Sequence, residues 1–244
     1  MKDFRYRESF KIRSNEVGID RLATPLAILH LMQEASMGSA VQLGVSIREL
    51  KPLNLAWVLL RKTFTIIDRP AIDEQVYVIT YPSNFDRFLA YRDYKLYNSQ
   101  GKLLAFASST WTLLNFVDRK MARIPQELSN ITVHPDEQLL EPPPSRLQVI
   151  QEATLVELIK VKLYDIDWNG HVNNLKYVKY ILENILPEYR ERSLDKIDFQ
   201  IKAEAFIDDM IYVQSGETKS DELAHRLVHA DTEKVIAIAN TYWA

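Results

Sequence analysis

The chain has 244 residues, of which 26% are charged and 47% hydrophobic, and its formal net charge is −3 at pH 7. This balance is typical of a globular protein and argues against binding nucleic acid through a basic surface. The absence of cysteine excludes disulfides, thiolate metal sites and a cysteine nucleophile. Because there is no apolar leader and no long apolar run, we expect a cytoplasmic protein without a membrane span.

The N-terminal part of the chain predicts a strand, a helix and then a run of antiparallel strands. Residues 8–13 alternate between polar and apolar side chains, as in a strand. Thr24 and Pro25 can cap and begin a helix of roughly four turns, with apolar residues at helical spacing. β-branched and aromatic residues then predict further strands, with residues 98–101 as a hairpin turn. These strands are expected at 57–67, 75–81, 87–97 and 102–115.

A segment with three consecutive prolines divides the chain into two parts. The pattern lapses between residues 118 and 150, and the prolines at 142–144 predict a stiff linker because proline lacks an N–H and restricts its neighbours. A strand at 154–163, a helix at 172–186 and three later strands then repeat the first plan. Two alignments support the repeat: 73–78 with 208–213, and 102–111 with 234–243. We therefore predict two units of one fold, at 1–118 and 151–244, joined by a linker at 119–150.

A polar segment, residues 165–174, stands directly before the second predicted helix. Its Asn169–Gly170 pair favours a turn, because both residue types tolerate positive φ. Asp167, Asn169 and His171 alternate, so their side chains share one side of an extended segment. A carboxylate, an amide and an imidazole then converge where an acyl group can lie.

The helix start adds a second chemical feature to this segment. Asn173 or Asn174 can cap the first free N–H groups of the helix. Those N–H groups and the helix dipole favour a developing negative charge, so a substrate carbonyl oxygen held there is stabilised as it becomes an oxyanion. A purely structural interpretation fits the same residues, in which the loop only makes the turn and the cap and His171 only pairs with Asp167.

Residues 165–174, Asp-Ile-Asp-Trp-Asn-Gly-His-Val-Asn-Asn, resemble the signature loop of the acyl-acyl carrier protein (ACP) thioesterases, which end fatty-acid synthesis by hydrolysing acyl thioesters. More loosely, they resemble the loop of 4-hydroxybenzoyl-CoA thioesterase-like hot-dog proteins. The likeness covers nearly the whole chain, because further segments fall in the family's order: 13–21, 31–35, 110–111 and 123–125. It implies an α+β tandem (double) hot-dog fold, in which each antiparallel sheet curls around a long central helix.

The resemblance also implies an activity, a partner and a catalytic set. The activity is hydrolysis of fatty acyl-ACP to a free fatty acid and the carrier thiol, without a cofactor or a metal, and the partner is ACP with its acyl chain. The family's catalytic glutamate matches Glu204, in a segment that reads as a strand, and joins Asp167, Asn169 and His171. Ala205 stands where the family has a cysteine. A Cys-His-Asn mechanism is therefore excluded here, and a carboxylate mechanism is left.

Two carboxylate mechanisms remain open. In the first, Glu204 or Asp167 takes a proton from water, while Asn169 and His171 position that water and the thioester. In the second, Asp167 attacks the thioester directly and gives an acyl-enzyme anhydride. The leaving thiolate has a conjugate thiol of pKa about 8.5, so the departing group needs little proton assistance on either route.

The repeat predicts that only the second unit is catalytic. Aligning Asp20 with Asp167 puts Leu22 and Thr24 at the positions of the amide and the imidazole, so the first unit lacks the polar set. We expect the first unit to supply the pocket for the acyl chain instead. The candidate pocket residues, which also fit an ordinary core, are Leu29, Met32, Trp57 and Leu59.

Two smaller features each allow two interpretations. Arg119, Lys120 and Arg123 form a local basic group, which can contact an acidic carrier protein or can be a solvated loop. His225 and His229 lie four residues apart in a predicted strand, as a metal-binding pair or as a surface pair.

Other functions remain as alternatives at this stage. The chain can be an acyl-CoA thioesterase, or a hot-dog dehydratase or hydratase, since those enzymes also place an Asp and a His at the helix start. It can also be a non-catalytic acyl-binding protein. A monomer and a homodimer are equally compatible with the sequence.

Overall fold

The computed structural model describes residues 4–125, 128, 140–150 and 152–244. The chain forms two compact units, Met1–Pro143 and Pro144–Ala244, which meet inside the proline run. Within the described residues, no helix is both long and apolar enough to cross a membrane.

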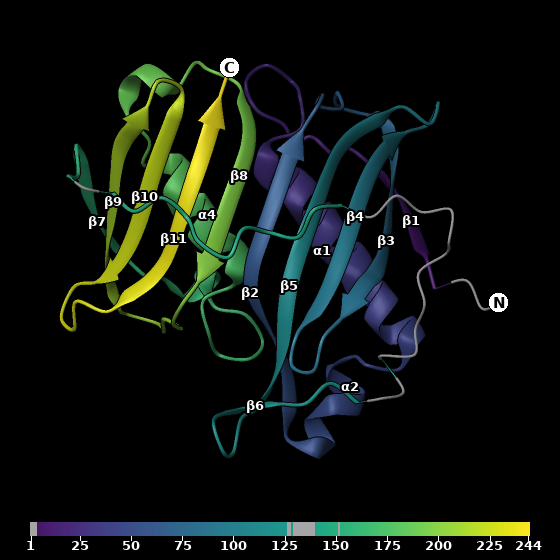
Figure 1. Cartoon of the computed structure of the whole chain (residues 1–244). Helices are drawn as coiled ribbons and strands as arrows, with labels where there is room; N and C mark the ends of the chain where they lie inside the picture. The colour runs from purple at the N-terminus through teal and green to yellow at the C-terminus, as the bar shows by residue number, and fades with distance from the viewer. Residues whose placement is uncertain (1–3, 126–127, 129–139, 151) are drawn as a thin grey trace. The chain divides into compact units, whose positions relative to one another are not determined.

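The first unit is an antiparallel sheet with a long helix against one face (Figure 1). The strand order is β1-β3-β4-β5-β2, and β6 pairs with β5 outside that order. The strands are β1 (Tyr6–Lys11), β2 (Leu55–Ile66), β3 (Gln75–Phe85), β4 (Ala90–Asn98), β5 (Leu103–Asn115) and β6 (Lys120–Ala122). The helices are α1 (Pro25–Leu43), α2 (Ile47–Leu50) and the 3-10 turn η1 (Lys51–Leu53).

The local signals for α1 and for the β4–β5 turn are confirmed. The Thr24 hydroxyl accepts the N–H of Ala27, and Pro25 is the first helical residue. The helix runs 19 residues to Gly44, whose φ of 70° ends it in the left-handed conformation, so it is longer than the expected four turns. In the hairpin, the Asn98 side chain accepts the N–H groups of Gln100 and Lys102, and Gly101 adopts a φ of 81°.

Part of the segment expected as a linker packs onto the first unit. The strand β6 pairs with the end of β5, and Ile124 and Leu128 join a buried cluster with Leu50 and Leu113. Residues 126–127 and 129–139 of the expected linker 119–150 lie outside the described residues. The described start of that segment therefore belongs to the first hydrophobic core.

The second unit has the same plan with a shorter helix. Its strand order is β8-β11-β10-β9-β7. Four strands follow the helix rather than the expected three, and the helix ends at Glu183 rather than Leu186. The elements are β7 (Leu155–Lys160), η2 (Leu163–Asp165), α4 (Asn174–Glu183), η3 (Pro187–Tyr189), β8 (Leu194–Ile201), β9 (Met210–Lys219), β10 (Glu222–His229) and β11 (Val235–Trp243).

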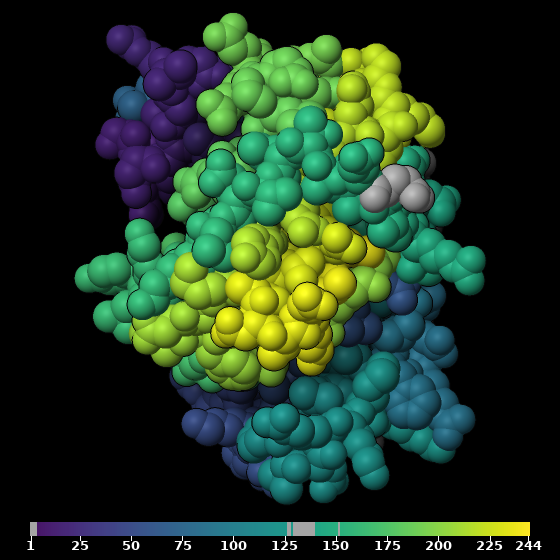
Figure 2. All heavy atoms as spheres, turned by 90° about the vertical axis from the view of Figure 1, so that its left-hand side faces the viewer, coloured from purple at the N-terminus to yellow at the C-terminus, as the bar shows by residue number. Residues whose placement is uncertain are grey.

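The segment before β7 lies beside the last strands of the same unit. In Figure 2 its teal-green spheres adjoin the yellow spheres of the C-terminal strands. The backbone N–H of Gln148 donates to the Asn240 side chain at 2.9 Å, and the Gln200 amide donates to the carbonyl oxygen of Pro144 at 3.0 Å. These bonds fix the start of the second unit across β8 and β11.

The two units repeat each other in hydrogen bonding as well as in element order. The Trp111 indole donates to Ser109 at 2.7 Å, and the Trp243 indole donates to Thr241 at 2.8 Å. Asp73 and Asp208 have φ values of 68° and 69°, and each pairs with a lysine at the end of the first strand of its unit. The two alignments made from the sequence are therefore confirmed, and the predicted tandem α+β architecture has two matching units that can be compared position by position.

Candidate active site

Asp167 organises the polar loop before α4 through its carboxylate. One oxygen, Oδ1, accepts the backbone N–H of Asn169 at 2.8 Å and that of His171 at 3.4 Å. The Asp167 N–H donates to the carbonyl oxygen of His171 at 2.8 Å, and Gly170 takes a φ of 83° to close the turn. The Asn169 amide lies 3.5 Å from the other carboxylate oxygen. The Asp167 carboxylate is therefore hydrogen-bonded within its own loop, and these bonds stabilise the loop conformation.

The start of α4 presents a free backbone donor next to this loop. The Asn173 side chain caps the helix by accepting the N–H of Leu175 at 3.0 Å, which confirms one of the two expected caps. Asn174 is the first helical residue, and its N–H has no acceptor among the residues that the structure describes. This N–H and the positive end of the helix dipole are available to a negatively charged group.

His171 and Glu204 face each other across the loop. The imidazole Nδ1 lies 3.4 Å from the carboxylate Oε1, and both side chains are partly exposed, at 36% and 49%. The ring of His171 also packs edge-to-face on Phe206, with the centroids 5.2 Å apart. A base, an imidazole and solvent access thus meet at one point of the second unit.

The expectation of a strand around Glu204 is wrong. Strand β8 ends at Ile201, and the N–H groups of Lys202 and Ala203 both turn to the carbonyl oxygen of Ile236. The chain therefore leaves the sheet before Glu204, which lies in the connection between β8 and β9. A connecting segment can point a carboxylate toward a neighbouring loop, whereas a strand would fix it to one sheet face.

A tyrosine on α4 holds the Glu204 segment in place, and sequence reasoning missed it. The Tyr177 hydroxyl accepts the backbone N–H of Ala205 at 3.0 Å, while the Ala205 carbonyl oxygen accepts the N–H of Val172 at 3.0 Å. Burial raises the pKa of Tyr177, so this hydroxyl stays protonated. The sequence signal that could have identified Tyr177 is a phenol at an apolar position of the predicted helix, because a buried hydroxyl needs a hydrogen-bond partner.

The first unit contains the same loop with different side chains. Isolated bridges join Val17 to Ala23 and Ile166 to Val172, so the two loops align with Ala23 opposite Val172. The bond from the N–H of Gly18 to Leu22 likewise matches that from Asp167 to His171. The alignment of Asp20 with Asp167 made from the sequence is therefore wrong by two residues. The equivalent pairs are Gly18 and Asp167, Asp20 and Asn169, Leu22 and His171, Pro25 and Asn174, and Arg69 and Glu204.

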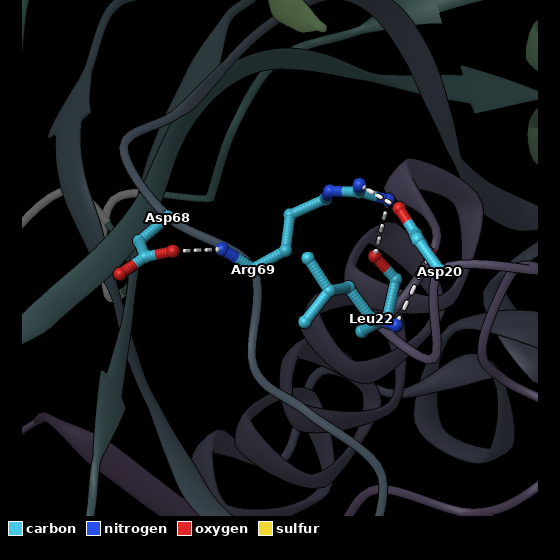
Figure 3. Close-up of polar contacts among 5 residues, drawn as sticks. Asp20, Leu22, Asp68 and Arg69 are labelled. Atoms are coloured by element: carbon cyan, nitrogen blue, oxygen red, sulfur yellow. Dashed lines mark hydrogen bonds and ion pairs between the residues drawn. The ribbon is translucent and has the colours of Figure 1, made fainter.

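In the first unit an ion pair joins Asp20 and Arg69, the equivalents of Asn169 and Glu204. Figure 3 shows the Arg69 side chain reaching over Leu22 to the Asp20 carboxylate. Asp20 also accepts the N–H of Leu22 at 3.1 Å, and this bond together with Arg69 lowers the pKa of Asp20. Pro25 has no N–H to offer at the helix start. The first unit therefore lacks the imidazole, the carboxylate base and the oxyanion donor.

The candidate acyl-pocket residues lie on α1 and β2. Leu29 and Met32 are completely buried and Leu59 nearly so, while Trp57 is half-buried and donates its indole N–H to the carbonyl oxygen of Val45 at 3.0 Å. They pack as core residues, and their role toward an acyl chain stays a prediction.

His225 is buried, so the interpretation as a surface residue is wrong for it. It is 1% exposed, and its ring nitrogens lie 2.8 Å from the hydroxyl oxygens of Ser215 and Thr241. Burial lowers its pKa to about 3, so the ring is neutral. Among the described residues there is no group of three or more potential metal ligands. Core hydrogen bonding thus accounts for His225, whereas the ring of His229 accepts the backbone N–H of Asp231 at 3.2 Å.

Comparison with known families matches both units. Residues 3–132 match the family model of the acyl-ACP thioesterase N-terminal domain, and residues 149–244 match that of the acyl-ACP thioesterase C-terminal domain. A palmitoyl-ACP thioesterase from Gossypium hirsutum is 27% identical over 92% of this chain and 57% of its own length. An oleoyl-ACP thioesterase from Arabidopsis thaliana is 27% identical over 92% of this chain and 66% of its own length. The chain thus spans roughly three fifths of these relatives.

Solved structures share the fold over the full chain. An acyl-ACP thioesterase from Bacteroides thetaiotaomicron superposes with a TM-score of 0.89 at 23% identity, over 99% of this chain and 98% of the other. The 12:0-ACP thioesterase from Umbellularia californica gives a TM-score of 0.85 at 23% identity, over 100% and 98%. The tandem hot-dog fold is therefore confirmed.

Proposed function

The chain belongs to the acyl-ACP thioesterase family, and from this premise we propose that it hydrolyses the thioester of a fatty acyl-ACP to a free fatty acid and the carrier thiol. The observation that carries the proposal is the pairing of His171 with Glu204 beside the free N–H at the start of α4. A single catalytic centre in the second unit follows, because the equivalent positions of the first unit hold Leu22, Arg69 and a proline.

Glu204 is the general base of this reaction, with His171 beside it. The carboxylate takes a proton from water, and the water oxygen attacks the thioester carbonyl carbon. The imidazole, 3.4 Å from the carboxylate, orients that water and the substrate. The tetrahedral intermediate then collapses and expels the thiolate, which needs little proton assistance because its conjugate thiol has a pKa of about 8.5.

Asp167 acts by shaping the loop rather than by attacking the substrate. Its Oδ1 already accepts two backbone N–H groups, at 2.8 Å and 3.4 Å. A carboxylate oxygen engaged in this way has fewer lone pairs free for a water or a substrate than the partly exposed Glu204 has. These bonds support the water mechanism over an acyl-enzyme anhydride on Asp167.

The start of α4 stabilises the charge that develops on the carbonyl oxygen. The N–H of Asn174 has no other acceptor among the described residues, and the helix dipole adds to it. Asn169 is exposed at the edge of the loop, where its amide can bind the thioester. Loss of a single oxyanion donor typically costs 10²–10³ in kcat.

Hydrolysis of a panel of acyl-ACP and acyl-CoA thioesters, followed by release of free thiol, tests the proposal. We expect His171→Ala and Glu204→Gln each to lower kcat by roughly 10²–10⁴, because each removes a proton-transfer or positioning group. The matched control is Leu22→Ala, which truncates the equivalent residue of the first unit and should leave kcat nearly unchanged. Parental rates in both site variants would exclude this centre.

The partner is the acidic carrier protein, and the basic turn of the first unit is its contact surface. Arg119, Lys120 and Arg123 are all exposed around β6. Three apolar side chains of the same turn are also exposed: Phe116, Val117 and Met121. Basic charge around an apolar centre suits a transient contact with an acidic protein.

A further inference from the structure

Two basic side chains lie on the inner face of the first sheet, beneath α1. Lys62 on β2 is 4% exposed. Arg92 on β4 donates to the hydroxyl of Ser39 on α1 at 2.9 Å and to that of Thr80 on β3 at 3.2 Å. In the sheet register both cations stand opposite Ser109 of β5, one from each side. They are therefore neighbours in the same layer.

Within the described part of the chain, neither cation has a carboxylate partner. The ammonium of Lys62 lies 4.4 Å from the centre of the Tyr94 ring, and the other charge acting on it is that of Arg92. Burial and Arg92 lower the pKa of Lys62 to about 7, and burial also lowers the pKa of Arg92. Two like charges in an interior are costly without an anion to compensate them.

The second unit shows that the fold does not require these charges. Thr241 is the counterpart of Ser109, because each accepts the indole N–H of a tryptophan two residues further on. Its neighbours in the register are Ile197 on β8 and Leu223 on β10, and both are completely buried. Two apolar side chains therefore fill, in one unit, the positions that two cations fill in the other.

Beyond the hydroxyls of Ser39, Thr80 and Ser109, the side chains that line the inner layer are mainly apolar and belong to the first core. The half of α1 that carries Ser39 has no counterpart in α4, which ends after ten residues. The completely buried apolar side chains of this layer include Met32, Phe64, Val78 and Leu96. A ligand that suits the layer must combine a hydrocarbon chain with an anionic group.

We propose that the inner layer of the first unit binds an aliphatic carboxylate, with the carboxylate held between Lys62 and Arg92. Among the residues that the structure describes, the N–H donors of the Lys62 ammonium face only the Tyr94 ring, and a carboxylate supplies the acceptors that they lack. Charge-assisted bonds of this kind are strong where water is excluded. Two molecules present the required group: a free fatty acid, and an acyl thioester whose far end is itself a carboxylate. The site is separate from the hydrolytic centre in the second unit and goes beyond the proposed function.

Binding of decanoate and of decanol to the purified full chain, measured by calorimetry, tests the site. We expect the parent to bind decanoate more tightly than decanol. Lys62→Met and Arg92→Met should each weaken decanoate at least about tenfold, the value of one charge-assisted hydrogen bond. Decanol affinity should change less than about twofold. The matched control is Lys219→Met, which makes the same change at an exposed lysine and should leave both affinities unaltered.

If Arg92→Met fails to fold, Lys62→Met alone tests the carboxylate site. Methionine at position 62 removes a costly buried charge and should be tolerated. Equal decanoate affinity in the parent and in Lys62→Met would overturn the proposal. Equal affinity of the parent for decanoate and decanol would overturn it as well. Calorimetry requires no turnover, so the loss of this site and the loss of the hydrolase activity are seen separately.

Hydrolysis then distinguishes the two sources of the carboxylate. The rates for decanoyl-ACP and for the monothioester of decanedioic acid with ACP are compared in the parent and in Lys62→Met. A preference for the diacid thioester that disappears in Lys62→Met assigns the site to the far end of the substrate. A defect confined to decanoate binding assigns it to the free fatty acid. If Lys62→Met changes neither measurement, the site does not exist.

Discussion

At the residue scale, the buried ammonium of Lys62 lowers the free energy of unfolding of the first unit. Its folded pKa of about 7 lies below the value of about 10.5 expected in the unfolded chain. Between these values the unfolded state binds more protons, so this group makes stability rise with pH. Below pH 7 the lysine is charged in both states, and the folded protein bears the full cost of burying it.

We therefore expect Lys62→Met to stabilise the protein, by on the order of 1–4 kcal/mol. The gain should be largest below pH 7 and should shrink as the pH rises toward 10, because the unfolded lysine then loses its proton as well. Urea unfolding at a series of pH values measures this, with Lys219→Met as the control. A destabilised Lys62→Met protein, or a gain independent of pH, contradicts a buried charge at this position.

At the element scale, α4 and the β8–β9 connection are joined through one backbone N–H. Ala205 donates it to Tyr177 at 3.0 Å. In the first unit the equivalents are Pro70, which has no N–H, and Ile28, which has no hydroxyl. Of these two equivalent positions, the one with a hydroxyl is thus the one where a backbone N–H needs an acceptor, and for this reason we propose that Tyr177 positions Glu204.

Tyr177→Phe should lower kcat by about tenfold or more with a smaller change in KM, and should destabilise the fold by about 1–3 kcal/mol, because it leaves a buried N–H unpaired. Tyr189→Phe is the control, since it removes a hydroxyl, bonded to Glu217 at 2.6 Å, from another buried tyrosine that lies away from the centre. Adding Ala205→Pro to Tyr177→Phe copies the first unit and should restore most of the stability. Full activity in Tyr177→Phe would refute the positioning role.

The elements that sequence reasoning predicted are those with local signals. Thr24 with Pro25 and the capping Asn173 are read from adjacent residues. The first helix starts where it was expected, whereas α4 starts at Asn174, two residues after the expected start at Val172. The register of the degenerate loop was wrong because Asp20 resembles Asp167 in charge, whereas the fold aligns Gly18 with it. The burial of Lys62 was not predictable either, because its surroundings come from strands distant in the sequence.

At the scale of the whole molecule, the residues of the candidate site also fall into two groups: those that a local sequence signal predicts and one that it does not. Asp167, Asn169 and His171 form one loop that is visible in the sequence, whereas Glu204 was found only through the family resemblance. Its contact with His171 depends on how the β8–β9 connection folds back to the loop, held by Tyr177 and Val172. A pattern confined to one segment contains no information about such a contact.

The proposed carrier contact is also a property of the whole molecule, because the proposal assigns carrier binding to the first unit and hydrolysis to the second. Reversing the charges of Arg119, Lys120 and Arg123 to glutamate should raise KM for acyl-ACP about tenfold and weaken its salt dependence, while acyl-CoA hydrolysis stays unchanged. Reversal of the exposed Arg190 and Lys219 is the control. An equal loss on both substrates would assign the defect to folding instead of docking.

The Asp20–Arg69 ion pair means that building a second catalytic centre into the first unit would take more than one substitution. Restoring a second centre requires a histidine at Leu22, a carboxylate at Arg69 and a residue with an N–H at Pro25. Replacing Arg69 alone leaves Asp20 without its partner, and the other two changes give no catalysis by themselves. No single substitution would thus give the first unit a second centre, and the three changes would have to be made together.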